Sequence, residues 1–317
     1  MHSIEIERMG SGDCMVVCVH GIWSDHLTFR PMLDLFGSDP TLRDWDLAWF
    51  DYDFNQQMAE SGRRLADEID RISETCKRIV IIAHSMGGLV ARFAILDRPL
   101  PRVNRLIMLG TPNCGAIRSA GLSWLAQAVA HVAGNVYGLF TRRTGIRDLT
   151  RVTQLFRAYH NKWEHANHVE YITIPGKFYH RDRSILDPPA LNRFTTIEVA
   201  TEFVSAMQPL FRVGLERPHD GIVEESSNRL APSEEGSRWS EKKAIINFPE
   251  RRSGQGYAHI TSEVCADLTH VELHTAPEII SIVARLIVAS DFQQFRQQLR
   301  PHELSDVKIS PDVDGRW

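Results

Sequence analysis

Strand-like and helix-like hydrophobic patterns alternate through the first third of the chain. Continuous apolar runs typical of buried strands occur at residues 15–19, 47–52, 78–82 and 103–109. Amphipathic or apolar runs typical of helices lie between them, at residues 28–36, 57–74 and 88–96. Such alternation predicts an α/β fold with a mostly parallel sheet and helices on both faces.

The alternation of strands and helices stops after Gly115. Residues 116–168 have a mostly helical pattern, and strand signal returns only at 169–176. We expect residues 116–168 to form a helical cap over the carboxyl ends of the strands, where open α/β sheets bind ligands. Extra packing helices are the alternative. A second insertion is expected at residues 177–218, in which a polar, irregular stretch at 177–192 precedes a helical run at 197–210.

The C-terminal third completes the predicted domain. Residues 243–248 are expected to form the last strand, and an apolar stripe that follows Pro277 predicts the final helix. Residues 296–317 are polar and are expected to form a loosely held tail. The sequence therefore predicts one domain, residues 1–295, with two insertions.

Composition narrows the class of protein. The 317 residues are 43% hydrophobic and 24% charged, which is enough for a sizeable core. A net charge of −4 without a long basic run predicts no nucleic-acid partner. No segment reaches the ~20 apolar residues that span a bilayer, so no integral membrane segment is expected.

Cysteine use and the N-terminus bear on the compartment. The five cysteines show no compact spacing, and the N-terminus is acidic and lacks a continuous apolar core. Free thiols and no signal peptide predict a cytoplasmic protein, although a leader that had been removed would leave no trace.

The segment Ala83-His84-Ser85-Met86-Gly87-Gly88 is the main candidate for chemistry. It joins a strand run to a helical run, which is the context of a nucleophile elbow. Such a turn lifts the serine hydroxyl above the strand end, beside a helix N-terminus, and requires small neighbours. Alanine stands where glycine is usual, and it is the next smallest side chain. An ordinary Ser-Gly loop is the alternative.

A serine hydroxyl needs a general base and a group that orients this base. In enzymes with a nucleophile elbow the acid, and then the histidine, follow the serine along the chain. Asp220, in an Asp-Gly turn before an apolar pair, is the candidate acid, with an ordinary turn as the alternative. His270, in the loop before the final helix, is the first choice for the base, and His274 and His259 remain open.

The oxyanion of an acyl-transfer reaction needs two backbone N–H donors. Met86, directly after the serine, would supply one, and Ile22, in the glycine turn after the first apolar run, is the candidate for the other. Residues that could line an acyl pocket, or simply fill the core, are Trp23, Phe29, Trp124, Leu125 and Phe140.

No cofactor or metal is expected. His160, His165 and His168 cluster, but no known ligand spacing is completed around them. A solvated helix face is the favoured interpretation of these histidines.

Five short segments follow the order seen in bacterial α/β-hydrolase lipases and esterases. They are Val17-Cys18-Val19-His20-Gly21-Ile22, Ala83-His84-Ser85-Met86-Gly87-Gly88, Leu109-Gly110-Thr111-Pro112-Asn113, Asp220-Gly221-Ile222-Val223 and His270-Val271-Glu272-Leu273. The chain resembles this superfamily, in particular the lipases whose elbow begins with alanine and the lipase-like relatives of the lipid-anchor inositol deacylases. The resemblance covers residues 16–112 well and is patchy afterwards.

The resemblance implies an α/β-hydrolase fold with Ser85 as nucleophile, Asp220 as orienting acid and His270 as base. It also implies an oxyanion hole formed by Ile22 and Met86. The expected activity is hydrolysis of a carboxylic ester, with a small-molecule ester or a lipid as substrate. Amide or thioester hydrolysis, lipid deacylation, and a catalytically silent binding protein are the alternatives.

Overall fold

The computed structural model describes residues 3–8, 10, 12–22, 24–72, 76–113, 148–149, 152–157, 168–176, 220, 223, 225–228, 257–260, 268, 270–298 and 307–309. The expected cap (116–168) and second insertion (177–218) lie mostly outside these residues. One short helix of the first, α7 (Val152–Arg157), is described. Both insertions therefore stay predictions.

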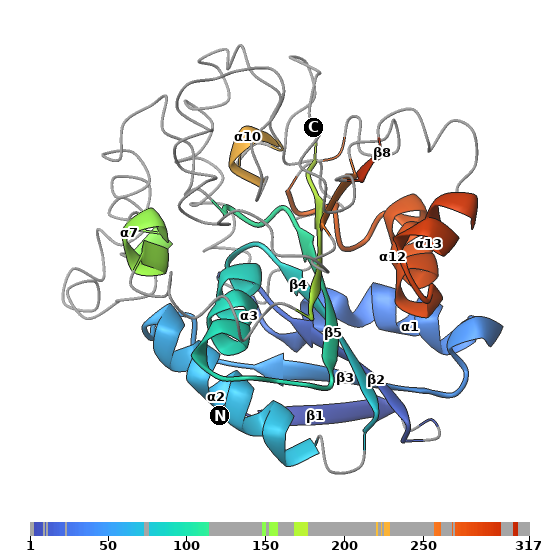
Figure 1. Ribbon diagram of the computed structural model, residues 1–317, viewed down its shortest axis with the longest axis horizontal. Helices are drawn as coiled ribbons and strands as arrows, with labels where there is room; N and C mark the ends of the chain where they lie inside the picture. The colour runs from blue at the N-terminus through green and yellow to red at the C-terminus, as the bar shows by residue number, and fades with distance from the viewer. Residues whose placement is uncertain are drawn as a thin grey trace.

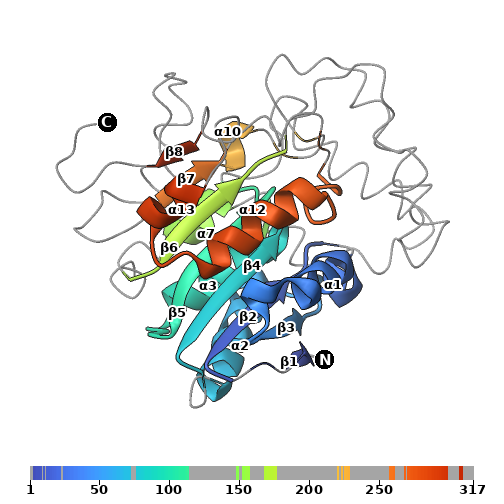
Figure 2. The same cartoon turned by 90° about the vertical axis from the view of Figure 1, so that its right-hand side faces the viewer.

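An eight-stranded sheet forms the centre of the fold, in the order β1-β3-β2-β4-β5-β6-β7-β8. The six inner strands are parallel, and the edge strands β1 and β8 are antiparallel to their neighbours. Figure 2 shows β6, β7 and β8 side by side at one end of the sheet and β1 at the other. The strands are β1 (Ser3–Arg8), β2 (Cys14–Val19), β3 (Trp45–Asp51), β4 (Arg78–His84), β5 (Val103–Leu109), β6 (Glu170–Ile174), β7 (Tyr257–Ile260) and β8 (Val307–Ile309).

Helices cover both faces of the sheet, as the sequence predicts. Figure 1 shows α2 and α3 on one side and α1 and α12 on the other. Besides α7, the helices among the described residues are η1 (His26–Phe29), α1 (Arg30–Ser38), η2 (Pro40–Leu42), α2 (Met58–Ile72), α3 (Met86–Asp97), α10 (Glu225–Asn228), α12 (Pro277–Val288) and α13 (Phe292–Gln298).

The continuous apolar runs reflect this two-sided burial. In β2, Val17 and Val19 belong to the core under α2 and α3, whereas Val16 and Cys18 belong to the core under α1 and α12. Successive side chains of a strand point to opposite faces, so a strand covered on both faces must be apolar at every position. Among the described helices, none is long and apolar enough to cross a membrane.

The C-terminal part of the sheet differs from the sequence prediction. Residues 243–248, expected as the last strand, lie outside the described part of the chain, and β7 and β8 both follow them. That segment is therefore not the last strand. β8 also lies within residues 296–317, for which the sequence predicts a loosely held tail, and it pairs with β7 in the sheet. Strands of four and three residues are too short to produce a clear hydrophobic pattern.

The buried stripe of α2 provides a test of the packing. Leu65 is fully buried, whereas Leu35 on α1 is 46% exposed. We expect Leu65→Ala to lower the free energy of unfolding by about 2–5 kcal/mol, because it leaves a cavity between α2 and the sheet. The control Leu35→Ala should change it by no more than ~0.5 kcal/mol. Urea denaturation measures both, and equal effects would contradict this placement of α2.

Candidate active site

Ser85 occupies a strained turn between β4 and α3. Its backbone angles are φ 53° and ψ −125°, and within the described stretches it is the one non-glycine residue with positive φ. Such a conformation costs about 1–3 kcal/mol and persists only where the surroundings hold it. Here the Ser85 N–H donates to the Leu109 carbonyl at 2.9 Å, and the Gly88 N–H donates to the Ser85 carbonyl at 3.1 Å. The sharp turn that the sequence predicts is thus present.

Small residues around Ser85 let neighbouring backbone come close. A Cβ added to Gly87 would overlap the carbonyl groups of Val19 and His20, and one added to Gly88 would overlap the Thr111 side chain. Ala83, in contrast, is an ordinary buried strand residue of β4, between β2 and β5. The alanine in place of the usual glycine therefore has room.

Asp220 and His270 form a buried hydrogen-bonded pair. The His270 Nδ1–H donates to Asp220 Oδ2 at 2.7 Å, and the His270 backbone N–H donates to the Asp220 carbonyl at 2.8 Å. The second carboxylate oxygen, Oδ1, accepts the Val223 N–H at 2.7 Å. Because Nδ1 carries the hydrogen that Asp220 accepts, Nε2 of the neutral His270 ring is left with a lone pair.

The carboxyl ends of β4, β5 and β6 bring this pair to the same end of the sheet as Ser85. Gly110, directly after β5, has φ 58°, and a Cβ built on it would lie 2.9 Å from His270 Nδ1. Gly176, just beyond β6, approaches Asp220 in the same way, with its added Cβ 2.7 Å from the Asp220 Cβ. The three residues that the sequence analysis selects thus gather at the carboxyl ends of adjacent parallel strands.

The loop after β2, which carries Ile22, lies against the Ser85 turn. A Cβ built on Gly21 would stand 2.9 Å from the Ser85 Cβ. Ile22 is half-buried and packs on the core, and Met86 is fully buried at the start of α3. The two predicted oxyanion donors therefore belong to segments on either side of Ser85, and their role stays a prediction.

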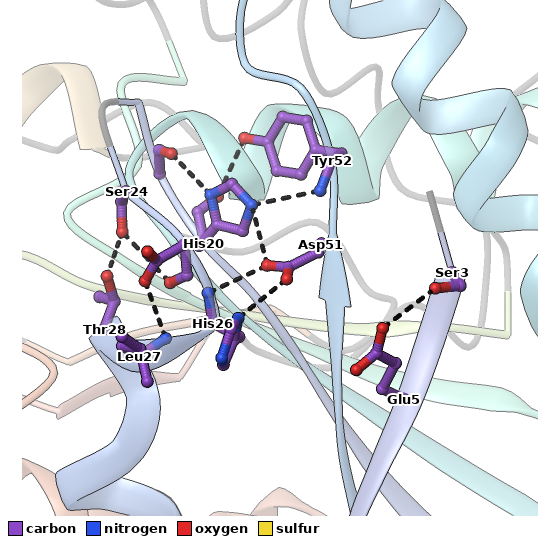
Figure 3. Close-up of polar contacts among 11 residues, drawn as sticks. Ser3, Glu5, His20, Ser24, His26, Leu27, Thr28, Asp51 and Tyr52 are labelled. Carbon is purple, nitrogen blue, oxygen red and sulfur yellow. Dashed lines mark hydrogen bonds and ion pairs between the residues drawn. The ribbon is translucent and has the colours of Figure 1, made fainter. Parts of the chain in front are cut away.

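His20 holds this loop to β3, which the sequence analysis missed. His20 Nε2 accepts the Tyr52 N–H at 3.2 Å, so Nδ1 carries the ring hydrogen and donates to the Gly21 carbonyl at 2.9 Å. The Tyr52 hydroxyl donates to the His20 carbonyl at 2.9 Å, and the two rings stack at 4.4 Å (Figure 3). Burial lowers the pKa of His20, which favours this neutral form.

Asp51, at the end of β3, adds a second attachment. Its Oδ1 accepts the His26 N–H at 3.0 Å, its Oδ2 lies 2.8 Å from His26 Nδ1, and His20 Nε2 lies 3.6 Å from Oδ1 (Figure 3). The carboxylate thus attaches His26, at the far end of the loop, to the end of β3, and it lies beside His20 at the start of the loop. The His-Gly motif marks this loop in the sequence, but nothing local in the sequence indicates that Asp51 is its partner.

A buried polar network connects the loop after β5 to α10, close to Asp220. Arg92, on α3, donates to the Asn113 side-chain oxygen at 2.9 Å. Asn113 donates in turn to the Asn228 carbonyl at 2.7 Å, and the Asn228 amide donates to the Thr111 carbonyl at 3.0 Å. The network ties the α10 segment, which follows Asp220, to the core beneath Ser85.

The remaining predicted site residues have different outcomes. Trp23, Trp124, Leu125 and Phe140 lie outside the described residues. Phe29 is fully buried in the core under α12, with its ring 6.1 Å from that of His274, so a place in an acyl pocket stays a prediction.

Histidines other than His270 also have definite places. His274 is buried, and its ring lies 4.7 Å from that of His84. His259 lies on β7, paired with Thr173 of β6. Of the three clustered histidines, only His168 is described, and its Nε2 lies 2.9 Å from the Leu100 carbonyl oxygen. Within the described residues, no group of three potential metal ligands occurs.

The contact between Gly87 and the end of β2 provides a direct test. Gly87→Ala is expected to lower the free energy of unfolding by about 1–3 kcal/mol, because the new methyl meets backbone that cannot move aside. Gly37 on α1 is the matched control, since an added Cβ meets nothing within 4 Å. Gly37→Ala should stabilise the helix by up to ~1 kcal/mol. Thermal denaturation measures both variants, and a neutral Gly87→Ala would rule out the close approach of α3 to β2.

Comparison with known proteins agrees with the fold. Among solved structures, Bacillus licheniformis lipase BlEst2 in its mature form has a TM-score of 0.55 and 15% identity, covering 91% of this chain and 98% of that one. Its propeptide form has a TM-score of 0.54 at 15% identity, covering 92% of this chain and 54% of that one. No curated protein sequence matches the chain. The sequence model of the alpha/beta hydrolase family matches residues 16–196, and the chain belongs to this family.

Proposed function

We propose that the chain is a serine hydrolase that cleaves carboxylic esters through an acyl-enzyme on Ser85. The observation that carries the proposal is the buried bond of 2.7 Å between His270 Nδ1 and Asp220 Oδ2. It joins two residues that are 50 positions apart in the sequence, at the carboxyl ends of the strands, where the strained Ser85 lies. A buried carboxylate that orients an imidazole beside an elbow serine is the arrangement that activates a hydroxyl nucleophile.

In the first step, the Ser85 hydroxyl oxygen attacks the ester carbonyl carbon while His270 Nε2 takes the hydroxyl proton. Nε2 is the acceptor because Nδ1–H is directed to Asp220. The buried Asp220 carboxylate stabilises the imidazolium that forms. The oxyanion of the tetrahedral intermediate binds the backbone N–H groups of Met86 and Ile22.

The intermediate then collapses to the acyl-enzyme. His270 Nε2–H donates its proton to the leaving alkoxide, and the alcohol departs. Water attacks the acyl group with His270 again as the base, and the breakdown of the second intermediate returns the proton to the Ser85 oxygen. The balanced reaction is ester plus water to carboxylic acid plus alcohol, and it consumes no cofactor.

The substrate class is a carboxylic ester, either a small molecule or a lipid. The fold shared with a bacterial lipase is consistent with this class. A series of p-nitrophenyl esters from acetate to palmitate would separate a tight pocket from a long acyl groove. Parallel amide and thioester substrates would reveal another acyl-transfer activity on the same residues.

Replacement of the nucleophile is the first test. Ser85→Ala is expected to reduce ester hydrolysis by roughly 10⁴- to 10⁶-fold, since no other group can form the acyl-enzyme. A fluorophosphonate should add one phosphonyl group to the wild-type protein, which peptide mass spectrometry should locate on Ser85. Ser61→Ala, a buried serine of α2, is the control and should keep full activity and full labelling. Retained hydrolysis by Ser85→Ala would refute the proposal.

Two histidine variants test the identity of the base. His270→Ala should lose roughly 10⁴-fold or more in kcat, because the hydroxyl loses its proton acceptor. His274→Ala should lose no more than about tenfold, because Asp220 orients His270. The kcat of each variant is measured by steady-state kinetics and divided by the concentration of folded protein, so that loss of folding is not mistaken for loss of activity. The reverse order of activity would transfer the role to His274.

A further inference from the structure

His84 joins the nucleophile turn to the loop that carries His270. It is the last residue of β4, directly before Ser85, and is 6% exposed. Its Nε2 lies 2.9 Å from the backbone carbonyl oxygen of His270. A carbonyl oxygen only accepts hydrogen bonds, so Nε2 carries the hydrogen and donates it. Nδ1 of the neutral ring then has a lone pair and no hydrogen.

Other imidazoles enclose the His84 ring. Its centroid lies 4.7 Å from that of His270 and 4.7 Å from that of His274. Nδ1 is buried without a hydrogen-bond partner among the described residues, and a Cβ built on Gly21 would be 3.3 Å from it. Burial lowers the pKa of His84 well below its usual range, and any positive charge on the neighbouring His270, His274 or His20 would lower it further. The ring is therefore a neutral donor with a fixed hydrogen.

His270 is held at three polar groups. Its backbone N–H and its ring Nδ1–H both donate to Asp220, at 2.8 and 2.7 Å. Its backbone carbonyl accepts from His84. Asp220 thus orients the ring and one side of the backbone, and His84 secures the other side of the backbone from β4. The fourth polar group, Nε2, is the one that the proposed mechanism uses.

We propose that His84 is a positioning residue, which sets the distance between the Ser85 hydroxyl and His270 by donating its Nε2–H to the His270 carbonyl. This inference rests on the proposed function of Ser85 and His270. Ser85 follows His84 directly in the chain. The hydrogen bond from His84 to the His270 backbone therefore fixes the position of His270 relative to Ser85 at the end of β4. A misplacement of reacting groups by 1 Å can cost ~10²-fold in rate.

Two variants with side chains of equal length isolate the contribution of the hydrogen bond from His84 to the His270 carbonyl. In His84→Gln the side-chain amide nitrogen stands about where Nε2 stands, whereas His84→Met has no donor. With a p-nitrophenyl ester, we expect His84→Met to lower kcat by about 10- to 100-fold and to leave KM within about threefold. His84→Gln should recover kcat to within about fivefold of wild type. A kcat loss of this kind at unchanged KM, with recovery by the donor variant, distinguishes positioning from a general loss of packing.

A measurement on the wild-type protein reports the tautomer of His84 directly, without reference to activity. In ¹⁵N-histidine-labelled protein, with the His84 signal assigned from its absence in His84→Gln, NMR should show the neutral Nε2–H tautomer. This form should persist as the pH falls through ~6.5, where a histidine of an unfolded chain takes up a proton. Below that pH, His84 binds a proton in the unfolded state but not in the folded state, so the free energy of unfolding falls as the pH falls. In His84→Gln this contribution to the pH dependence of the free energy of unfolding should be absent. The Nδ1–H tautomer would overturn the inference.

The outcomes separate the inference from the proposed function. If His84→Met keeps wild-type kcat while Ser85→Ala is inactive, the positioning role is overturned and the function stands. Equal losses of kcat in His84→Gln and His84→Met would also overturn it, because the donor would then make no difference. An active Ser85→Ala variant would overturn both.

Discussion

The left-handed backbone of Ser85 is the constraint on which the rest of this site depends. A serine at φ 53° is unstable unless its neighbours leave it no better conformation. The sheet meets this requirement by placing β5 and β2 on either side of the turn. The Leu109 carbonyl takes the Ser85 N–H, and the glycines at the start of α3 lie against β2 and against the loop after β5. The strand order is thus a condition for holding the Ser85 turn at the strand ends.

Buried imidazoles near the turn have their hydrogens at defined nitrogen atoms. In His20 the hydrogen is on Nδ1, because Nε2 accepts a backbone N–H, whereas in His84 it is on Nε2, because its partner is a carbonyl oxygen. His270 directs Nδ1–H to a carboxylate. Backbone partners select the tautomers of His20 and His84, the Asp220 carboxylate selects that of His270, and burial keeps His20 and His84 neutral. His20 and His84 can therefore serve as oriented hydrogen-bonding groups without a change of charge, whereas the proposed reaction protonates His270.

Much of the first third of the fold is predictable, because strands buried on both faces must be apolar throughout and the helices between them need a stripe. β5 has the predicted bounds, and the elbow lies at the predicted turn. Asp220 and His270 could be proposed only from chain order, and their bond of 2.7 Å depends on loops 50 residues apart. β7 and β8 left no clear pattern, since a strand of three or four residues draws its stability from its neighbours. The contacts of His20 and His84 could not be predicted from local sequence either. Both lie within recognised motifs, but their partners Tyr52 and His270 are set by tertiary structure.

The contacts that hold the proposed nucleophile and those that hold the proposed base come from different parts of the chain, with consequences for folding. Every described contact that holds the Ser85 backbone lies within residues 3–113, where strands are joined by short crossovers. The Asp220–His270 pair joins only after more than a hundred further residues. Domains generally fold as units. The core on the α1 face of β2 and β4 is completed by α12, the next helix after His270 in the chain. The C-terminal part that brings His270 to the strand ends therefore also covers the strands that hold Ser85, so the two parts of the site form in one cooperative step.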